Sequence, residues 1–289
     1  MQPVTKTVLS ADGTPITYYV LGRGPRTWLA APAMGAPYVA MSRVYEPLSE
    51  DLRIVTWDMR GFHRSGVPAD PRALDVARHV DDLEAVVEAE GLERFVLGGW
   101  SMGVPISLEY LARDARRVEG LVLVNGPYTA AFDQAIPVPG LGDAMARVLE
   151  VVGAPAGRLM NPLSARLLGQ RGVGRLLQAL GVIAREPEFF EKILADFRTV
   201  DWERYLVVAR MLHEHDASPH LPKVRVPTLV TAGTRDLMIP VRTARQLVER
   251  VEGAELFVVE GGTHYTPAEF PELVAERIRR FLDERLPEL

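Results

Sequence analysis

The sequence predicts an α/β fold: a mostly parallel, eight-stranded sheet flanked by helices, with a helical cap inserted into it. Two observations lead to this prediction. Short apolar, β-branched runs alternate with longer stretches whose apolar residues recur at helical spacing, and strands joined through helices form parallel sheets. The alternation stops over residues 127–221, where only helical patterns follow one another, and about 95 residues are too many for a loop between sheet elements.

The expected strands and helices follow from these patterns in chain order. The first two strands surround Asp12-Gly13, a dipeptide typical of a hairpin turn. Leu74 to Glu90 has apolar residues at helical spacing, and Gly91 marks the expected end of that helix. We expect strands at 5–9, 16–21, 28–31, 54–57, 95–97, 121–124, 228–231 and 256–259, and core helices at 38–50, 74–90, 104–112, 241–251 and 272–286.

The long interruption divides the chain into two predicted domains. Residues 1–126 and 222–289 are expected to form the α/β core, and residues 127–221 the helical cap, or lid. The helices expected in the cap are 144–152, 165–168, 174–183, 187–197 and 202–213, with prolines and glycines between them. A chain of 289 residues is long enough for a core of this kind and an insertion.

Composition excludes several classes of function. The net charge of −5 argues against a nucleic-acid partner recognised through its phosphates, and no stretch reaches the ~18 apolar residues of a transmembrane helix. The absence of cysteine excludes disulfides, thiolate catalysis and cysteine-based zinc sites. Residues 1–13 contain no apolar segment of a secretory signal, so we expect a cytoplasmic protein. Composition leaves the oligomeric state open.

The pentapeptide Gly99-Trp100-Ser101-Met102-Gly103 matches the G-x-S-x-G pattern of a nucleophilic serine. The match alone is weak, but an apolar run enters it and a helical pattern leaves it. A strand that turns sharply into a helix needs small residues on both sides, because the two backbones approach closely. A glycine-rich turn whose serine only caps the helix is the alternative, and it accounts less well for this context. We therefore predict that Ser101 is the nucleophile.

Ser101 needs a base within hydrogen-bond reach, because a serine hydroxyl is a poor nucleophile at neutral pH. His264 follows the last expected strand, and Asp236 follows the strand before it. Both lie after the carboxyl ends of parallel strands, at the edge where open α/β sheets place their ligands. Alone, either could be an ordinary polar loop residue. The order Ser, Asp, His is the one that this nucleophile turn requires, so we predict a triad of Ser101, His264 and Asp236.

These motifs resemble those of the α/β-hydrolase superfamily over nearly the whole chain. The segment from Trp57 to Gly66 is similar to the family's D-x-R-G-x-G-x-S segment, with His63 in place of the second glycine. Residues 227–236 are similar to the P-T-L-v-x-x-G-x-x-D stretch that carries the family's acid. The resemblance implies that the first segment is structural, that Asp236 is the acid, and that residues 127–221 cover the site.

The family commonly has His-Gly after its third strand, where the next backbone amide helps to stabilise an oxyanion. This chain has Pro32-Ala33-Met34 in that place. Because backbone amides do not depend on the side chain, we expect the N–H groups of Met34 and Met102 to bind the oxyanion, with Ala33 as the alternative to Met34. Each such donor is typically worth ~3–4 kcal/mol of transition-state stabilisation.

Trp100 and Met238 are the expected substrate contacts. Trp100 precedes the nucleophile and Met238 follows the proposed acid, and adaptable apolar surface of this kind suits an acyl chain or an aromatic leaving group. Both residue types are also common in ordinary core positions. The expected partner is a small-molecule, ester-like substrate with an apolar acyl or aromatic part.

Other candidate sites are weaker. The histidines of residues 213–220 are close in sequence, but residues two apart do not share a helix face and the H-E-x-x-H spacing is absent, so we expect no metal. Asp58 is a rival acid whose place in the segment after the fourth strand favours a structural role. Gly22-x-Gly24 lacks a third suitably spaced glycine, which argues against a nucleotide site, and no cofactor is expected.

The predicted reaction is hydrolysis of a carboxylic ester, of esterase or lipase type, through an acyl-enzyme on Ser101. A serine nucleophile argues against the haloalkane dehalogenase and epoxide hydrolase branches, which carry aspartate at that position. C–C bond hydrolases, thioesterases, acyltransferases and perhydrolases use the same triad and remain alternatives. A ligand-binding homologue without activity is a further alternative, although a pure binder has no need of all three residues.

Overall fold

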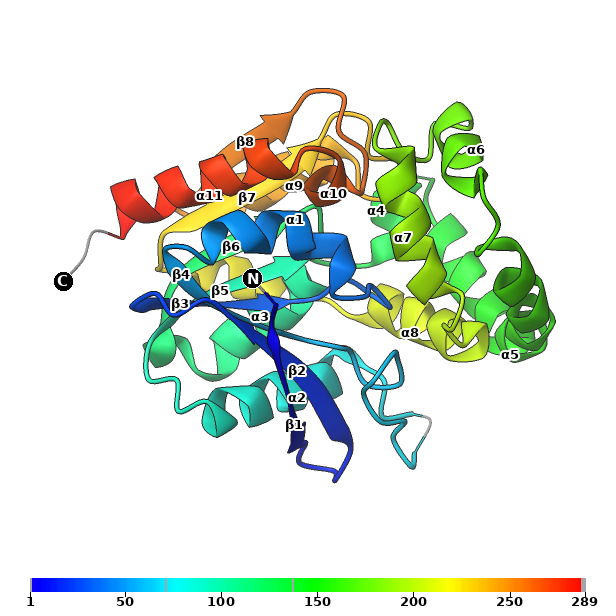
Figure 1. Cartoon of the computed structure of the whole chain (residues 1–289), viewed down its shortest axis with the longest axis horizontal. Helices are drawn as coiled ribbons and strands as arrows, with labels where there is room; N and C mark the ends of the chain where they lie inside the picture. The colour runs from blue at the N-terminus through cyan, green and yellow to red at the C-terminus, as the bar shows by residue number, and fades with distance from the viewer. Residues whose placement is uncertain (1, 71, 137, 287–289) are drawn as a thin grey trace.

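The computed structural model describes residues 2–70, 72–136 and 138–286, and at its centre lies an eight-stranded sheet (Figure 1). The strand order is β1-β2-β4-β3-β5-β6-β7-β8; the β1/β2 and β2/β4 pairs are antiparallel, and the other pairs are parallel. The predicted fold class is confirmed. The strands are β1 (Val4–Leu9), β2 (Pro15–Leu21), β3 (Arg26–Ala31), β4 (Leu52–Trp57), β5 (Phe95–Trp100), β6 (Val118–Val124), β7 (Thr228–Gly233) and β8 (Glu255–Val259).

Helices cover both faces of the sheet, and the buried apolar residues form two layers accordingly. On one face, α2 (Val76–Ala89), α3 (Gly103–Arg113) and α9 (Val241–Arg250) contribute side chains such as Leu83 and Leu247 to one apolar layer. On the other face, α1 (Val39–Leu48) and α11 (Pro271–Arg285) pack together through residues such as Val44 and Ile278. Central strands covered on both faces need continuous apolar runs, which is the pattern that predicted them.

Between β6 and β7 the chain forms a group of helices beyond one end of the sheet (Figure 1). Arg204 Nε donates to Gly61 O at 3.0 Å, and the ring of Tyr205 lies against Gly35, so this group covers the loops after β3 and β4. The segment predicted as a cap, residues 127–221, contains this group of helices, and its residue 137 lies outside the described residues. The helices are α4 (Ala131–Ala135), α5 (Leu141–Leu167), α6 (Val173–Ala179), α7 (Pro187–Phe197) and α8 (Trp202–Glu214), followed by a 3₁₀ turn (Ser218–Lys223).

The longest of these helices differs from the prediction. We expected separate helices at 144–152 and 165–168, but α5 continues through Pro155 and Pro162 to Leu167. A Cβ on Gly157 would lie 2.4 Å from the Cα of Glu203, so α5 and α8 approach closely along small residues. Proline weakens a helix, but this packing outweighs the local preference. Among the described residues, neither α5 nor any other helix combines the length and the apolar character needed to cross a membrane.

A buried ionic group holds the segment that follows β4. Arg60 is inaccessible to solvent and donates to Asp82 Oδ2 and Asp12 Oδ2, each at 2.8 Å. His79 is buried beside this group, and neither of its ring nitrogens has a hydrogen-bond partner within the described residues. Burial, together with the positive charge of Arg60, lowers the pKa of His79 to about 3. His79 is therefore neutral in the folded protein at neutral pH.

Acid is expected to destabilise the fold through His79. Because its folded-state pKa is about 3 and its ordinary value is 6.5, the unfolded chain binds the proton first as the pH falls. The effect is absent well above pH 6.5 and grows as the pH falls toward 3, reaching roughly 2 kcal/mol at pH 5. Urea unfolding at pH 7.5 and pH 5 measures this effect. Between these two pH values, the free energy of unfolding of His79→Leu should fall by roughly 2 kcal/mol less than that of wild type. Equal losses in both proteins would contradict this assignment.

Candidate active site

Ser101 lies at the tip of a sharp turn between β5 and α3. Its φ of +54° is in the left-handed region, where a non-glycine residue persists only if the surrounding structure imposes it. The flanking glycines are required by space: a Cβ on Gly99 would lie 2.0 Å from Gly103 O, and one on Gly103 would lie 2.3 Å from Ala31 O. The predicted strand, turn and helix are all present, and Ser101 is half-buried at the carboxyl edge of the parallel strands.

His264 and Asp236 lie on the loops that follow β8 and β7. His264 Nε2 is 2.9 Å from Ser101 Oγ, and His264 Nδ1 is 2.9 Å from Asp236 Oδ2. Because a carboxylate only accepts, Nδ1 carries the proton and Nε2 is free to accept one from Ser101. His264 and Asp236 are 6% and 4% exposed, so little water competes for these bonds. The structure thus brings together the three side chains that the sequence singled out.

Asp236 is held by donors on both of its oxygens. Oδ1 accepts the backbone N–H groups of Met238 at 2.9 Å and Ile239 at 2.7 Å, and Oδ2 accepts from Asn125 Nδ2 at 3.0 Å as well as from His264. Asn125 is buried directly after β6, with a φ of +44°, and the sequence analysis missed it. Its position in the sequence could have indicated it, because Asn125 directly follows β6, and β6 ends at the same edge of the sheet as the strands that precede Ser101, Asp236 and His264.

Two buried side chains support the loop that carries His264. Trp100 Nε1 donates to His264 O at 3.1 Å, and Glu269 in α10 (Thr266–Glu269) accepts from Thr263 N and Thr263 Oγ1, both at 2.9 Å. Glu269 also accepts the backbone N–H of Ala184, which lies between α6 and α7, at 2.6 Å. This carboxylate therefore links the histidine loop directly to the helices between β6 and β7. The sequence analysis did not identify Glu269.

Comparison with known proteins gives the family. The sequence pattern described as "alpha/beta hydrolase fold" matches residues 35–271, which is most of the chain and includes Ser101, Asp236 and His264. The chain belongs to the α/β-hydrolase fold family. It is 28% identical to a protein of Agrobacterium fabrum named putative carbamate hydrolase RutD, over 82% of this chain and 85% of that protein. It is 22% identical to a proline iminopeptidase of Saccharolobus solfataricus, over 81% of this chain and 76% of that protein.

Solved α/β-hydrolase structures show the same fold. An esterase from Exiguobacterium antarcticum superposes with a TM-score of 0.75 at 20% identity, covering 97% of this chain and 100% of that one. A bromoperoxidase from Bacillus anthracis superposes with a TM-score of 0.78 at 19% identity, again covering 97% and 100%. These likenesses concern the fold alone. Since one fold supports such differently named activities, the reaction must be argued from the site.

The chain departs from the α/β-hydrolase pattern in the loop after β3, and we call Pro32–Ala36 the oxyanion loop. Ala36 N donates to Ala33 O at 3.0 Å, and Gly35 has a φ of +62°, as the third position of a type II turn requires. Within the described part of the chain, the N–H of Met34 donates to no protein acceptor. The N–H of Met102 belongs to the first turn of α3, where amides have no partner inside the helix.

Trp100 and Met238 occupy very different environments. Trp100 is 4% exposed, its Nε1 is bonded to His264 O, and its ring packs against His264 and Tyr265. The substrate contact expected at Trp100 is therefore corrected: β5 is a central strand covered on both faces, and its last side chain points into the packed layer beneath the histidine loop. Met238 is 46% exposed and directly follows the loop of Asp236, so it remains accessible to a substrate.

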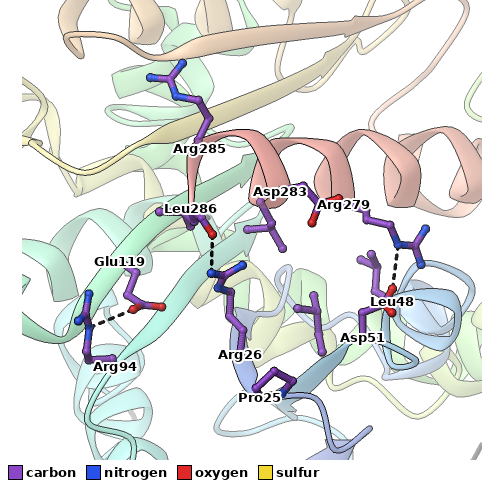
Figure 2. A pocket seen from close by; sticks show the side chains of 12 residues that line it. Pro25, Arg26, Leu48, Asp51, Arg94, Glu119, Arg279, Asp283, Arg285 and Leu286 are labelled. Atoms are coloured by element: carbon purple, nitrogen blue, oxygen red, sulfur yellow. Dashed lines mark hydrogen bonds and ion pairs between the residues drawn. The ribbon is translucent and has the colours of Figure 1, made fainter. Parts of the chain in front are cut away.

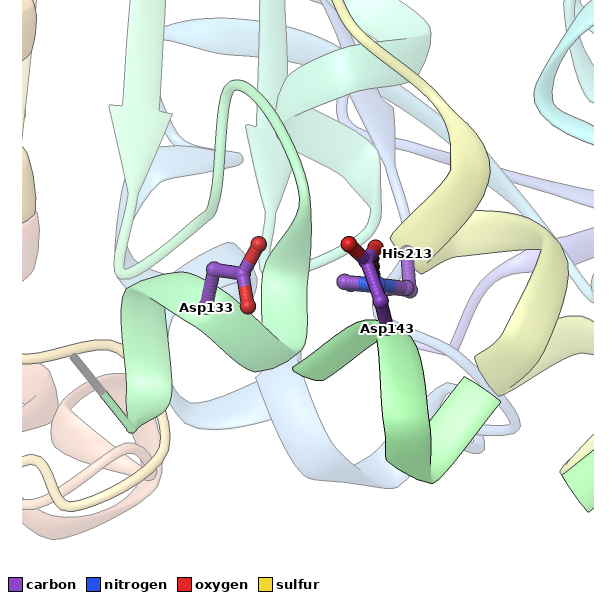
Figure 3. A group of neighbouring side chains, drawn as sticks. All are labelled: Asp133, Asp143 and His213. Carbon is purple, nitrogen blue, oxygen red and sulfur yellow. Dashed lines mark hydrogen bonds and ion pairs between the residues drawn. The ribbon is translucent and has the colours of Figure 1, made fainter. Parts of the chain in front are cut away.

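A histidine and two carboxylates meet among the helices between β6 and β7: Asp133 of α4, Asp143 of α5 and His213 of α8 (Figure 3). Phe132 N donates to His213 Nδ1 at 3.3 Å, so Nε2 carries the ring proton and donates to Asp143 Oδ1 at 3.2 Å. A protonated nitrogen offers no lone pair to a metal. We therefore interpret Phe132 N, His213 and Asp143 as a hydrogen-bonded clasp between α4, α8 and α5. Asp133 Oδ1 is buried beside the clasp and has no hydrogen-bond partner among the described residues.

A cleft of about 930 Å³ lies at the opposite end of the sheet, where the parallel strands begin (Figure 2). Three of its arginines are bonded within the cleft itself, namely Arg26 to Leu286 O, Arg94 to Glu119 and Arg279 to Asp51, and the fourth, Arg285, is paired with Glu255. Charged groups that are already paired in this way are poorly suited to recognise a ligand. The chemistry-bearing residues lie instead at the carboxyl edge, as open α/β sheets require.

Proposed function

We propose that the chain hydrolyses carboxylic esters through an acyl-enzyme on Ser101. The observation that supports this most is the continuous path from Ser101 Oγ through His264 to Asp236, with 2.9 Å at each step. A serine without a base is unreactive at neutral pH, whereas this one has its proton acceptor already in contact. A binding protein would need neither the strained turn at Ser101 nor a buried carboxylate behind the histidine.

In the proposed reaction, Ser101 Oγ attacks the carbonyl carbon of the ester while His264 Nε2 takes its proton. The new C–O bond turns the carbonyl into a tetrahedral oxyanion, and Asp236 stabilises the imidazolium. When the oxyanion collapses, the ester C–O bond breaks and His264 gives its proton to the departing alcohol. Water then attacks the acyl-enzyme, His264 takes a proton from it, and the acid and Ser101 are released.

The proposed oxyanion donors are the backbone N–H groups of Met34 and Met102. Neither needs a particular side chain, so the replacement of His-Gly by Pro32-Ala33 leaves this chemistry intact. The N-terminal end of α3 adds a partial positive charge beside the developing oxyanion. Met238 and the half-buried Met34 favour a substrate with an apolar acyl or aromatic part, and residues 127–221 are proposed to cover it as a cap.

Carbamate hydrolysis is a second candidate for the same site. It is favoured by the relatives of several bacteria that are named putative carbamate hydrolase RutD, such as the one from Rhizobium rhizogenes, 28% identical over 83% of this chain. A carbamate presents the same carbonyl to Ser101, and its nitrogen donates electrons into that carbonyl. The resulting carbamoyl-enzyme is less electrophilic than an acyl-enzyme, so water releases it more slowly.

A panel of p-nitrophenyl substrates separates the two candidates. Acetate, butyrate and octanoate esters are compared with p-nitrophenyl carbamate, and His264→Ala serves as the matched variant without a base. The proposal predicts steady ester turnover with a preference for an apolar acyl group, and at most one equivalent of p-nitrophenol from the carbamate. Faster steady turnover of the carbamate would favour the second candidate, and equal rates in wild type and His264→Ala would exclude both.

Asn125 is expected to matter through Asp236. Asn125→Gly removes the donor to Asp236 Oδ2 while keeping a residue that tolerates a φ of +44°. With the carboxylate less firmly oriented, kcat for the best ester should fall about tenfold, since misplacing a supporting group by a fraction of an ångström weakens a preorganised site. Steady-state kinetics measure this, with Asn161→Gly in α5 as the control. An unchanged kcat would show that the backbone donors at Met238 and Ile239 hold Asp236 alone.

A further inference from the structure

Two departures from the α/β-hydrolase pattern are in contact with each other. His63 stands where the pattern has its second glycine, and Pro32-Ala33 stand where it has His-Gly. His63 Nε2 is 2.9 Å from Gly35 O, in the oxyanion loop. Because a carbonyl oxygen only accepts, Nε2 carries the proton and donates it. We propose that His63 is a positioning residue that fixes the oxyanion loop from outside, in place of the histidine that the loop itself lacks.

His63 has a strained backbone conformation, so having a histidine at this position costs conformational energy. Its φ is +49°, in the region that a glycine adopts freely and a histidine does not. A glycine there would relieve the strain but would leave Gly35 O without this donor. Strain of this kind persists where the surrounding structure imposes it, and it clusters at functional sites.

The surroundings of His63 are firmly held. Asp58 Oδ2 accepts the N–H of Arg64 at 3.1 Å and the hydroxyl of Tyr19 at 2.8 Å, and Ser65 Oγ donates to Asp58 O at 2.6 Å. Asp58, the rival acid of the sequence analysis, thus holds the two residues that follow His63. The segment is a rigid frame that presents the imidazole to the oxyanion loop.

The oxyanion loop is held from its other side by the cap. A Cβ on Gly35 would lie 3.3 Å from the ring of Tyr205, so α8 lies tightly against this position. Met34 N–H and Gly35 O belong to one hydrogen-bonded turn, closed by Ala36 N and Ala33 O. Gly35 O shares its peptide plane with Ala36 N, and the Met34 N–H shares its plane with Ala33 O, so this hydrogen bond couples the two planes. A donor on Gly35 O therefore restricts both.

This inference rests on the proposed function, and it predicts a particular kinetic signature. In the proposed reaction the oxyanion forms only in the transition state, so its donors act mainly after the substrate has bound. Loss of the His63 bond should therefore lower kcat and leave KM nearly unchanged. It should also increase the mobility of the oxyanion loop, whatever substrate the enzyme prefers.

Three variants separate positioning from folding. His63→Asn tolerates the left-handed backbone but is too short to reach Gly35 O, His63→Gly removes both the strain and the donor, and His63→Gln restores a donor at nearly the same reach. We measure kcat and KM for p-nitrophenyl butyrate, the melting temperature, and hydrogen–deuterium exchange of the peptide that spans residues 31–38. His220→Asn in the 3₁₀ turn is the histidine control.

We expect His63→Asn and His63→Gly to lose about 10- to 100-fold in kcat, with KM within twofold of wild type. Exchange of the loop peptide should rise in both, His63→Gly should melt no lower than wild type, and His63→Gln should recover at least part of the kcat. Unchanged exchange and kcat in His63→Asn would overturn the proposal, as would a loss in all three variants that simply follows their melting temperatures. If wild type cleaves no ester the proposed function fails, and loop exchange alone still decides the role of His63.

Discussion

Replacing Ser101 by alanine is expected to lower kcat for p-nitrophenyl butyrate by about 10⁴- to 10⁶-fold. The variant keeps the turn, the histidine and the oxyanion donors but has no oxygen to form the acyl-enzyme. Water held by His264 is then the only nucleophile left, and it lacks the orientation of the serine hydroxyl. The measurement is p-nitrophenol release at saturating substrate, after the variant has been shown to melt as wild type does.

Ser42→Ala is the matched control for this prediction. Ser42 is buried in α1, and within the described parts of the chain its hydroxyl donates only to Val39 O of its own helix. Each variant loses one serine hydroxyl group, so a general effect of replacing a serine by alanine would appear in both. We expect the rate of Ser42→Ala to stay within about twofold of wild type, as is usual for a change away from the chemistry. A rate for Ser101→Ala as high as that of the control would remove Ser101 from the mechanism.

Asp236→Asn has the second largest expected effect, a loss of about 10⁴-fold in kcat. Asp236 Oδ2 accepts from both His264 Nδ1 and Asn125 Nδ2. If the amide NH₂ group of the asparagine takes the place of Oδ2, it faces the N–H groups of His264 and Asn125, and three donors meet with no acceptor between them. His264 then gains by moving its proton to Nε2, and that nitrogen can no longer accept the proton of Ser101. The negative charge that stabilises the imidazolium is also lost.

The change at Asp236 is measured with the same ester across pH 6 to pH 10, with Asp133→Asn in α4 as the control. The substitution preserves size and the two backbone hydrogen bonds accepted at Oδ1, so the melting temperature should change far less than the rate. Asp133→Asn removes a carboxylate beside the clasp of His213 and Asp143 and should leave kcat within about twofold. A mild loss in Asp236→Asn, equal to that of the control, would mean that another carboxylate orients His264.

The sequence was sufficient for the fold and for selecting Ser101, Asp236 and His264, which the structure places in contact, because each depends on local patterns. Apolar runs with the period and length typical of strands predicted the sheet. Glycine is required at positions 99 and 103 because a Cβ there would lie 2.0 and 2.3 Å, respectively, from a backbone oxygen. Asp236 and His264 follow parallel strands, and all such strands end at one edge. Topology therefore brings these residues together without any knowledge of side-chain packing.

What the sequence did not reveal depends on contacts between distant segments. Asn125 and Glu269 are ordinary polar residues until β6 and α10 are placed beside the loops that they hold. Trp100 precedes the nucleophile, which suggested a substrate contact, but only the packed layer under α10 shows that the indole supports His264 O. α5 crosses two prolines because α8 packs against its small residues, and the short helices α4 and α10 are too brief to show a period.

The most direct test of the account is covalent labelling with a fluorophosphonate, read by mass spectrometry of the digested protein. The account predicts one adduct per chain on the peptide that contains Ser101, formed at neutral pH and slowed strongly in His264→Ala. Ser101→Ala should give no adduct at any position. Labelling that persists in Ser101→Ala, or wild type that stays unlabelled while remaining folded, would contradict the claim that Ser101 is an activated nucleophile.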